Sequence, residues 1–162
     1  MSKPGRLTID ASGEREIVVT RVFDAPRELV FDALTRPDLL RRWFTGPDGW
    51  TLSVCEFEPR VGGAYRNVWR QESDGFEMGM GGIIREFVRP ERVVATEKYD
   101  QAWYAGEAVT KQELSERGGK TVLTMTLRYE SREVRDLVLK SPMEGGLSVG
   151  FDRLEDFLAT LH

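Results

Sequence analysis

The sequence predicts an α+β domain, in which a long C-terminal helix covers an antiparallel sheet of six to seven strands. Three observations support this prediction. Segments rich in β-branched and aromatic residues recur between residues 16 and 130. Short turns containing glycine or proline separate these segments, and short links join antiparallel neighbours because parallel strands need long crossovers. After Pro142 the apolar residues take the spacing of one face of a helix.

The N-terminal part of the chain predicts one strand and two short helices. The full length of 162 residues suits a single domain. We expect residues 1–14 to be a loose tail and residues 15–162 to form that domain. Glu16–Phe23 is rich in β-branched residues and predicts the first strand. Prolines open two short helices, which we expect at about 26–34 and 38–44.

Six further strands follow these helices. They are bounded by glycine pairs, Asp-Gly and Pro-Glu turns, and we expect them at Thr51–Glu58, Ala64–Gln71, Glu77–Val88, Arg92–Asp100, Glu107–Glu116 and Lys120–Glu130. Arg132–Lys140 predicts a helix that Ser141 and Pro142 end. The last helix carries its apolar residues on one face and is long enough to cover the sheet: Met143, Leu147, Phe151, Leu154, Leu158 and Leu161.

Composition excludes several functional classes. Acidic residues outnumber basic ones by 27 to 23, and the net charge of −4 argues against a general nucleic-acid binder. Cys55 is the single cysteine, which rules out an intramolecular disulfide and fits a reducing cytoplasm. His162 is the single histidine and the last residue, so we predict no metal site, no cofactor and no histidine-based catalytic pair. No apolar run is long enough for a membrane span.

Two strings look catalytic, but their context does not support catalysis. Residues 146–150 spell G-x-S-x-G, the string of a hydrolase nucleophile elbow, yet they lie inside a helical pattern rather than between a strand and a helix. Residues 118–121 end like a phosphate-binding loop, but Leu114 stands where that motif requires a glycine. We interpret this second string as a hairpin turn. The sequence therefore predicts no catalytic residue.

Charged positions set the phase of the strands and predict a pocket. If charged side chains face water, the inner face of the sheet is mostly apolar and aromatic with a few polar groups, which is the composition of a small-molecule pocket. Glycines on the last helix either leave room for a ligand or allow close packing on the sheet. The predicted ligand-binding residues are Tyr65, Asn67, Trp69, Met78, Met80, Glu97, Tyr99, Thr110, Gln112, Met125, Met143, Gly146, Leu147, Gly150 and Phe151.

A series of short strings resembles a known superfamily in order and spacing. The main ones lie at Phe23–Pro26, Val61–Arg66, Pro90–Val93, Lys120–Thr124 and Gly146–Leu154. They are similar to the START-like, helix-grip superfamily (SRPBCC), in the branch related to the C-terminal domain of the heat-shock-protein-90 ATPase activator. The resemblance implies a curved sheet that grips the C-terminal helix around a lipophilic cavity. Relatives bind lipids, hormones or polyketides and some are cyclases, but the superfamily shares no catalytic motif.

One position departs from the pattern of the resembling proteins. Phe151 stands where relatives often have tryptophan or tyrosine after the glycine. This difference should reshape the cavity without removing it.

The sequence is consistent with three functions. The leading hypothesis is a non-catalytic protein that binds a small hydrophobic molecule. The second is a cyclase- or hydrolase-like enzyme in which Glu97 is the general acid or base, because a carboxyl on an apolar wall has a raised pKa. The third is a chaperone-associated protein, as the resemblance suggests.

Two further expectations concern named side chains. We expect the Glu97 carboxyl to face the interior and to have a polar or basic partner, such as Tyr99, Gln112 or an arginine. We also expect Trp43, Phe44 and Trp50 to be exposed, as a pocket mouth or the patch of a possible homodimer.

Overall fold

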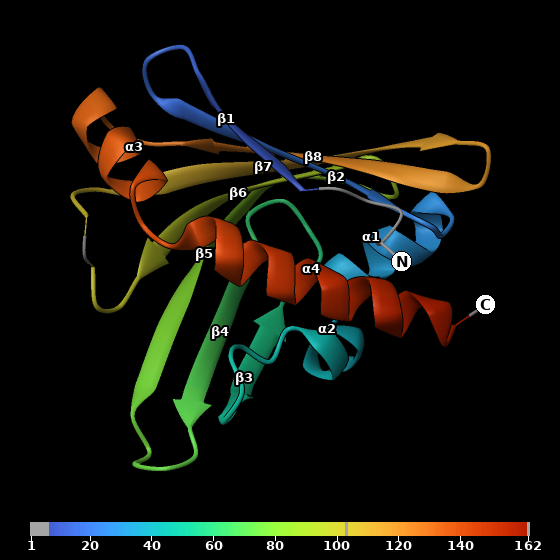
Figure 1. The fold of residues 1–162 in the computed structure, drawn as a ribbon, viewed down its shortest axis with the longest axis horizontal. Helices are drawn as coiled ribbons and strands as arrows, with labels where there is room; N and C mark the ends of the chain where they lie inside the picture. The colour runs from blue at the N-terminus through green and yellow to red at the C-terminus, as the bar shows by residue number, and fades with distance from the viewer. Residues whose placement is uncertain (1–6, 103, 162) are drawn as a thin grey trace.

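The computed structural model describes residues 7–102 and 104–161, and in them one antiparallel sheet of eight strands curves around the C-terminal helix (Figure 1). The strand order is β1-β2-β8-β7-β6-β5-β4-β3. The strands are β1 Thr8–Ser12, β2 Glu16–Phe23, β3 Trp50–Phe57, β4 Ala64–Gln71, β5 Glu77–Val88, β6 Arg92–Tyr99, β7 Ala108–Arg117 and β8 Lys120–Arg128.

Four helices complete the described part of the chain. α1 (Arg27–Thr35) and α2 (Pro37–Trp43) link β2 to β3, and α3 (Arg132–Leu139) leads into α4 (Met143–Ala159). α4 runs across the concave side of the sheet (Figure 1). The predicted fold class is confirmed, with eight strands in place of six to seven.

The additional strand is β1, in a segment that we expected to be loose. It pairs antiparallel with β2, from Thr8 opposite Thr20 to Ser12 opposite Glu16. Gly13 allows the tight turn between the two strands because its φ is +57°. Five strand residues, most of them polar or small, are too few to show a period of two, which is why the sequence did not predict this strand.

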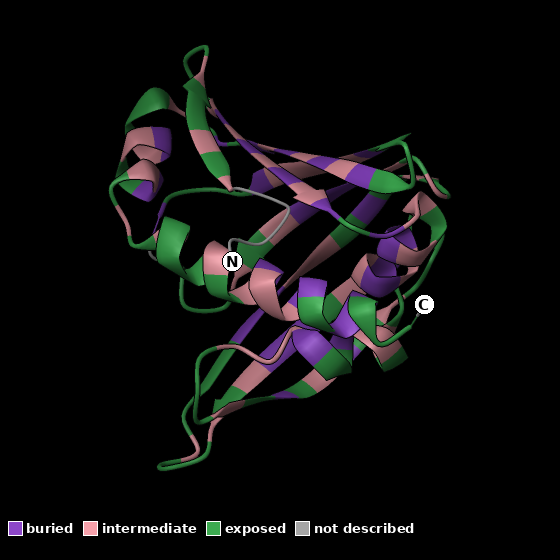
Figure 2. Cartoon of the chain, turned by 45° about the vertical axis from the view of Figure 1, so that its right-hand side comes forward, coloured by how far each residue is buried: buried purple, intermediate pink, exposed green. Residues whose placement is uncertain are grey.

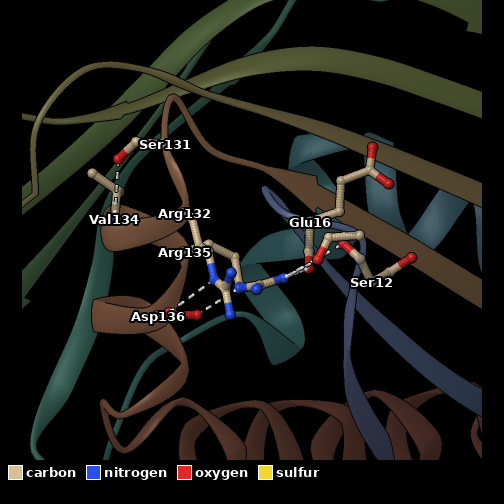
Figure 3. Close-up of polar contacts among 8 residues, drawn as sticks. Ser12, Glu16, Ser131, Arg132, Val134, Arg135 and Asp136 are labelled. Carbon is tan, nitrogen blue, oxygen red and sulfur yellow. Dashed lines mark hydrogen bonds and ion pairs between the residues drawn. The ribbon is translucent and has the colours of Figure 1, made fainter.

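Arg135 on α3 holds the turn between β1 and β2 in place (Figure 3). Its Nη1 donates to the carbonyl oxygens of Glu16 at 2.9 Å, Gly13 at 3.2 Å and Ser12 at 3.4 Å. Its Nε donates to the Asp136 carboxylate at 2.8 Å. The side chain is 4% exposed, so this buried cation is paired and also satisfies backbone acceptors.

Irregularities in two strands accompany the bend of the sheet. The pairing of β5 with β6 shifts register between Ile84 and Glu86, and that of β3 with β4 shifts between Leu52 and Val54. A bulge of this kind bends its strand and increases its twist. As a result, β3, β4 and β5 turn away from the plane of β1, β2, β7 and β8 (Figure 1), and the sheet has a concave face.

The two halves of α4 differ in burial. Its buried residues all lie from Phe151 onward, where Leu154 and Leu158 are fully buried and the ring of Phe151 packs edge-on against Phe23 at 5.7 Å. From Met143 to Gly150 every residue is exposed or half-buried (Figure 2). The second half of α4 therefore completes the core, while the first half lies over a part of the interior that side chains do not fill.

Candidate ligand-binding cavity

A cavity of about 660 Å³ lies between the concave face of the sheet and the first half of α4. This volume is in the range of pockets that bind small organic molecules. The sheet contributes Tyr65, Asn67, Trp69, Met78, Met80, Val93, Ala95, Glu97, Tyr99, Thr110, Gln112, Met125 and Leu127. The α4 side contributes Met143, Gly146, Leu147 and Phe151.

A third side of the cavity comes from segments that strand alternation could not predict. It consists of α1, α2, the loop that follows α2, part of β3 and the link before α4: Leu34, Leu40, Trp43, Phe44, Gly46, Pro47, Trp50, Phe57, Ser141 and Pro142. Phe44 and Trp69 connect this side to β4, since their rings meet edge-on at 5.1 Å and the Trp69 indole donates to the Phe44 carbonyl at 3.0 Å.

Every predicted ligand-binding residue except Gly150 borders this cavity. Gly150 lies outside its wall, and the next residue, Phe151, is the last residue of α4 that borders the cavity. A Cβ atom added at Gly146 or Gly150 would meet no heavy atom within 4 Å. The alternative that these glycines serve close packing on the sheet is therefore wrong.

The expectation of three exposed aromatic residues after α2 is also corrected. Trp43 is only 3% exposed, and its indole nitrogen donates to the Ala33 carbonyl at 2.9 Å. Phe44 and Trp50 are half-buried and border the cavity. Trp43 belongs to the core and Phe44 packs against it, because α2 lays its apolar side on the core. Trp50 begins β3, and its ring meets that of Phe76 edge-on at 6.2 Å.

Arg153 fastens the loop after α2 to α4. Its guanidinium donates to the Thr45 hydroxyl at 3.0 Å, to the Gly46 carbonyl and to the Asp48 carboxylate at 2.9 Å. Gly46 borders the cavity, so these contacts hold one of its walls against the helix.

Glu97 brings a carboxyl to the sheet side of the cavity. It lies on β6 opposite the fully buried Ala108 of β7. Among the described residues, none donates a hydrogen bond to this carboxyl. The expected partners are therefore wrong: Gln112 has its amide nitrogen 3.9 Å from the Met125 sulfur instead. Desolvation in this enclosed position raises the pKa of Glu97 to about 7.

Four tyrosines surround this carboxyl. Burial first, and the charge of Glu97 second, raise the pKa values of Tyr65, Tyr99, Tyr104 and Tyr129. Tyr104 meets Tyr99 edge-on at 6.4 Å and Tyr129 edge-on at 5.5 Å. The neighbourhood of Glu97 is therefore aromatic, and its four tyrosines are neutral at neutral pH.

The polar side chains of Thr110 and Asn67 on the sheet side of the wall make weak contacts. The Thr110 hydroxyl donates to the Ala95 carbonyl at 3.4 Å, and the Asn67 amide nitrogen lies 3.6 Å from the Met80 sulfur. The Asn67 side-chain oxygen is buried without a hydrogen-bond partner among the described residues. These groups leave hydrogen-bonding capacity unused beside the cavity.

A curved antiparallel sheet that encloses an apolar cavity against a C-terminal helix defines the START-like, helix-grip class of proteins. Within that class, the sequence pattern of the family described as Activator of Hsp90 ATPase homolog 1-like protein matches residues 24–159. The chain belongs to this family, and the resemblance inferred from its short strings is confirmed.

Solved structures of bacterial proteins share the fold along nearly the whole chain. A protein from Rhodobacter sphaeroides is 31% identical with a TM-score of 0.89, covering 96% of this chain and 99% of its own. One from Chromobacterium violaceum is 28% identical with a TM-score of 0.70, covering 91% and 96%. One from Mycobacterium smegmatis, 19% identical with a TM-score of 0.83 over 97% and 100%, shows the fold alone. No functionally curated protein matches the sequence.

In the described ranges, no helix is long and apolar enough to cross a membrane.

Proposed function

We propose that this protein binds a small hydrophobic molecule in the cavity between the sheet and α4, and leaves it chemically unchanged. The observation that carries the proposal is the cavity itself, with its volume of about 660 Å³ and its mainly apolar and aromatic walls. A few polar groups on such walls are the usual means of orienting a ligand.

The packing of the interior supports this proposal. Protein interiors are normally as dense as organic crystals, and side chains that border an empty space lose contacts on that side. Met143 and Leu147 of α4 face the cavity and remain only half-buried. A bound apolar molecule would cover them and gain about 25 cal/mol for each Å² of apolar surface removed from water.

In this proposal the residues that border the cavity take two roles. Tyr65, Trp69, Met78, Met80, Tyr99, Met125, Met143, Gly146, Leu147 and Phe151 would form the apolar surface that the ligand contacts. The polar side chains Asn67, Glu97, Thr110 and Gln112 would orient a polar group of the ligand.

A titration with diphenylhexatriene, an uncharged hydrocarbon that fluoresces in apolar surroundings, tests this function. We expect saturable binding of one molecule per chain at micromolar concentration. Native mass spectrometry of protein purified from cells should also detect a small molecule that is lost on unfolding. A folded protein that binds no probe and carries no molecule would overturn the proposal.

The Glu97 carboxyl favours acid–base catalysis as a second candidate. Its pKa of about 7 is suited to proton transfer near neutral pH, and it borders the cavity. Under this alternative, the molecule recovered from the protein would be converted on incubation with fresh protein. Glu97→Gln would abolish conversion and retain binding, whereas a binding protein returns the molecule unchanged.

We also propose that the protein works in the cytoplasm. Cys55 is a buried free thiol and the only cysteine of the sequence. Proteins of oxidising compartments more often use cysteines in disulfides. Cell fractionation with a specific antibody tests this location.

A further inference from the structure

Glu97 is the one acidic residue among the described residues that border the cavity, and none of the others is lysine, arginine or histidine. The cavity therefore presents a single carboxyl group and no positive charge of its own. No described residue that borders the cavity can pair with this carboxyl as a cation, whereas a ligand in the cavity can.

The surroundings of Glu97 leave its carboxyl without a donor. The Tyr65 hydroxyl donates to the Thr96 carbonyl at 2.7 Å, and the Gln112 amide lies beside the Met125 sulfur. An ionised carboxylate removed from water and left without hydrogen bonds is costly. A cation at this position would recover that cost, because oppositely charged groups attract strongly where water is excluded.

The aromatic rings around Glu97 also favour a cation. Tyr65 and Tyr99 border the cavity, and the charge of Glu97 acts on both. The face of an aromatic ring carries negative potential and attracts ammonium groups within about 6 Å of the ring centroid. An ammonium group beside the carboxylate would therefore also lie near these two rings.

We propose that the ligand is a hydrophobic molecule with a protonated amine, and that Glu97 pairs with this ammonium group inside the cavity. This inference rests on the proposed binding function and adds the chemical class of the ligand. A fatty acid would instead bring its carboxylate close to Glu97, so anionic lipids are disfavoured.

Displacement of diphenylhexatriene by three molecules with the same alkyl chain tests the proposal: octylamine, octanol and octanoate. At pH 8 we expect octylamine to displace the probe at a concentration about tenfold lower than octanol, and octanoate to be the weakest of the three. In Glu97→Gln, octylamine and octanol should become equivalent while the probe still binds, which shows that the variant is folded.

A matched variant controls for general attraction of cations to an acidic protein. Glu107→Gln makes the same chemical change at an exposed carboxyl outside the cavity wall, and it should keep the preference for octylamine. If the wild-type protein binds the probe but does not prefer octylamine, or if Glu97→Gln keeps the preference, the proposed ligand class is wrong and the binding function stands. If the wild-type protein does not bind the probe, the binding function itself fails.

The preference should also depend on pH. The pKa of Glu97 is about 7, so the carboxyl is mostly protonated at pH 6 and octylamine should lose most of its advantage there. The tyrosines around Glu97 have raised pKa values and stay neutral over this range: Tyr65, Tyr99, Tyr104 and Tyr129. The charge of the exposed Glu107, just before β7, also acts on Tyr65, which is why Glu107→Gln is the control variant. The residues of α4 at the cavity have no titratable side chain: Met143, Gly146, Leu147 and Phe151. If octylamine displaces the probe better than octanol by the same factor at pH 6 and pH 8, the proposed pairing with Glu97 is wrong.

Discussion

The hydroxyl of Tyr65 donates its hydrogen bond to the backbone carbonyl of Thr96 at 2.7 Å, across the inner face of the sheet. This bond commits the hydroxyl to the backbone immediately before Glu97 and leaves the Glu97 carboxyl without that donor. The Glu97 carboxyl therefore lies among tyrosine rings, but it accepts no hydrogen bond from the hydroxyl groups of the described residues. The free energy of unfolding therefore depends on whether the Glu97 carboxyl is protonated.

Glu97→Gln should make the protein more stable at high pH and leave it unchanged at low pH. The folded pKa of about 7 lies above the ordinary value of 4.5, so ionisation costs the folded state. Below pH 4.5 both states are protonated and no cost arises. The free energy of unfolding of the wild-type protein therefore falls as the pH rises from 4.5 to 7. Above pH 7 the loss is complete, and a pKa shift of this size corresponds to roughly 3 kcal/mol.

Urea unfolding of wild type and Glu97→Gln at pH 4.5 and pH 8 measures this difference directly. The free energy of unfolding of the variant, relative to that of wild type, should increase by roughly 3 kcal/mol from pH 4.5 to pH 8. Glu107→Gln, at an exposed carboxyl, should show no such gain. The same difference between wild type and Glu97→Gln at both pH values would mean that the Glu97 carboxyl is not enclosed.

Thr110→Trp should weaken the binding of diphenylhexatriene. Thr110 borders the cavity, and a larger side chain would occupy part of the space. We expect the affinity to fall about tenfold or more. Lys111→Trp is the matched control, because its position lies next along β7 and outside the cavity wall. Equal affinities of the two variants would contradict the placement of the binding site.

Gly150→Ala should stabilise α4 and leave probe binding unchanged. Its new Cβ would meet no heavy atom within 4 Å, and alanine is favoured over glycine within a helix by up to about 1 kcal/mol. Gly82→Ala in β5 should do the opposite and cost about 1–3 kcal/mol, because its Cβ would collide with the Thr96 carbonyl oxygen. Thermal melts should show a higher melting temperature for Gly150→Ala and a lower one for Gly82→Ala than for wild type. A lower melting temperature of Gly150→Ala would show that α4 packs too closely against its surroundings to leave room for a Cβ atom at this position.

Arg135→Met should destabilise the protein by about 1–3 kcal/mol, because the carbonyls of the β1–β2 turn lose a shared buried donor (Figure 3). Arg132→Met changes the same residue type on the same helix. Arg132 is 67% exposed and its nearest contact with Asp136 is 3.8 Å, so this variant should cost less than about 0.5 kcal/mol. Urea midpoints compare the two, and equal costs would refute a specific role for Arg135.

The strands were predictable where charge and turn residues coincide. The bounds of β4 and β5 agree with those expected from the sequence, because a glycine pair precedes β4 and an Asp-Gly turn separates it from β5. The phase of β6 was predictable from Asp100, which pairs with Arg66 of β4 in an exposed ion pair at 2.6 Å. That pairing leaves Glu97 and Tyr99 on the inner face.

The rest of the site depends on packing that no local pattern reports. Trp43 and Phe44 take their places because α2 packs against α1 and the residue after α2 packs against Trp69 of β4. The hydrogen bonds of Tyr65 and Gln112 likewise depend on distances across the sheet, so the absence of a donor for Glu97 could not be read from residue types. Gly150 shares a helix face with Leu147 in the sequence pattern, but its neighbour Phe151, which also packs against Phe23, borders the cavity in its place.

The methionine methyl groups provide the most direct test of binding in this cavity. Met78, Met80, Met125 and Met143 all border it, from the two strands β5 and β8 and from α4. In NMR spectra of protein labelled with ¹³C at the methionine methyl groups, we expect diphenylhexatriene to shift all four signals with one saturable, micromolar affinity. Signals that stay unchanged in a folded protein at saturating probe would contradict the account, because the space between the sheet and α4 would then not be a binding site.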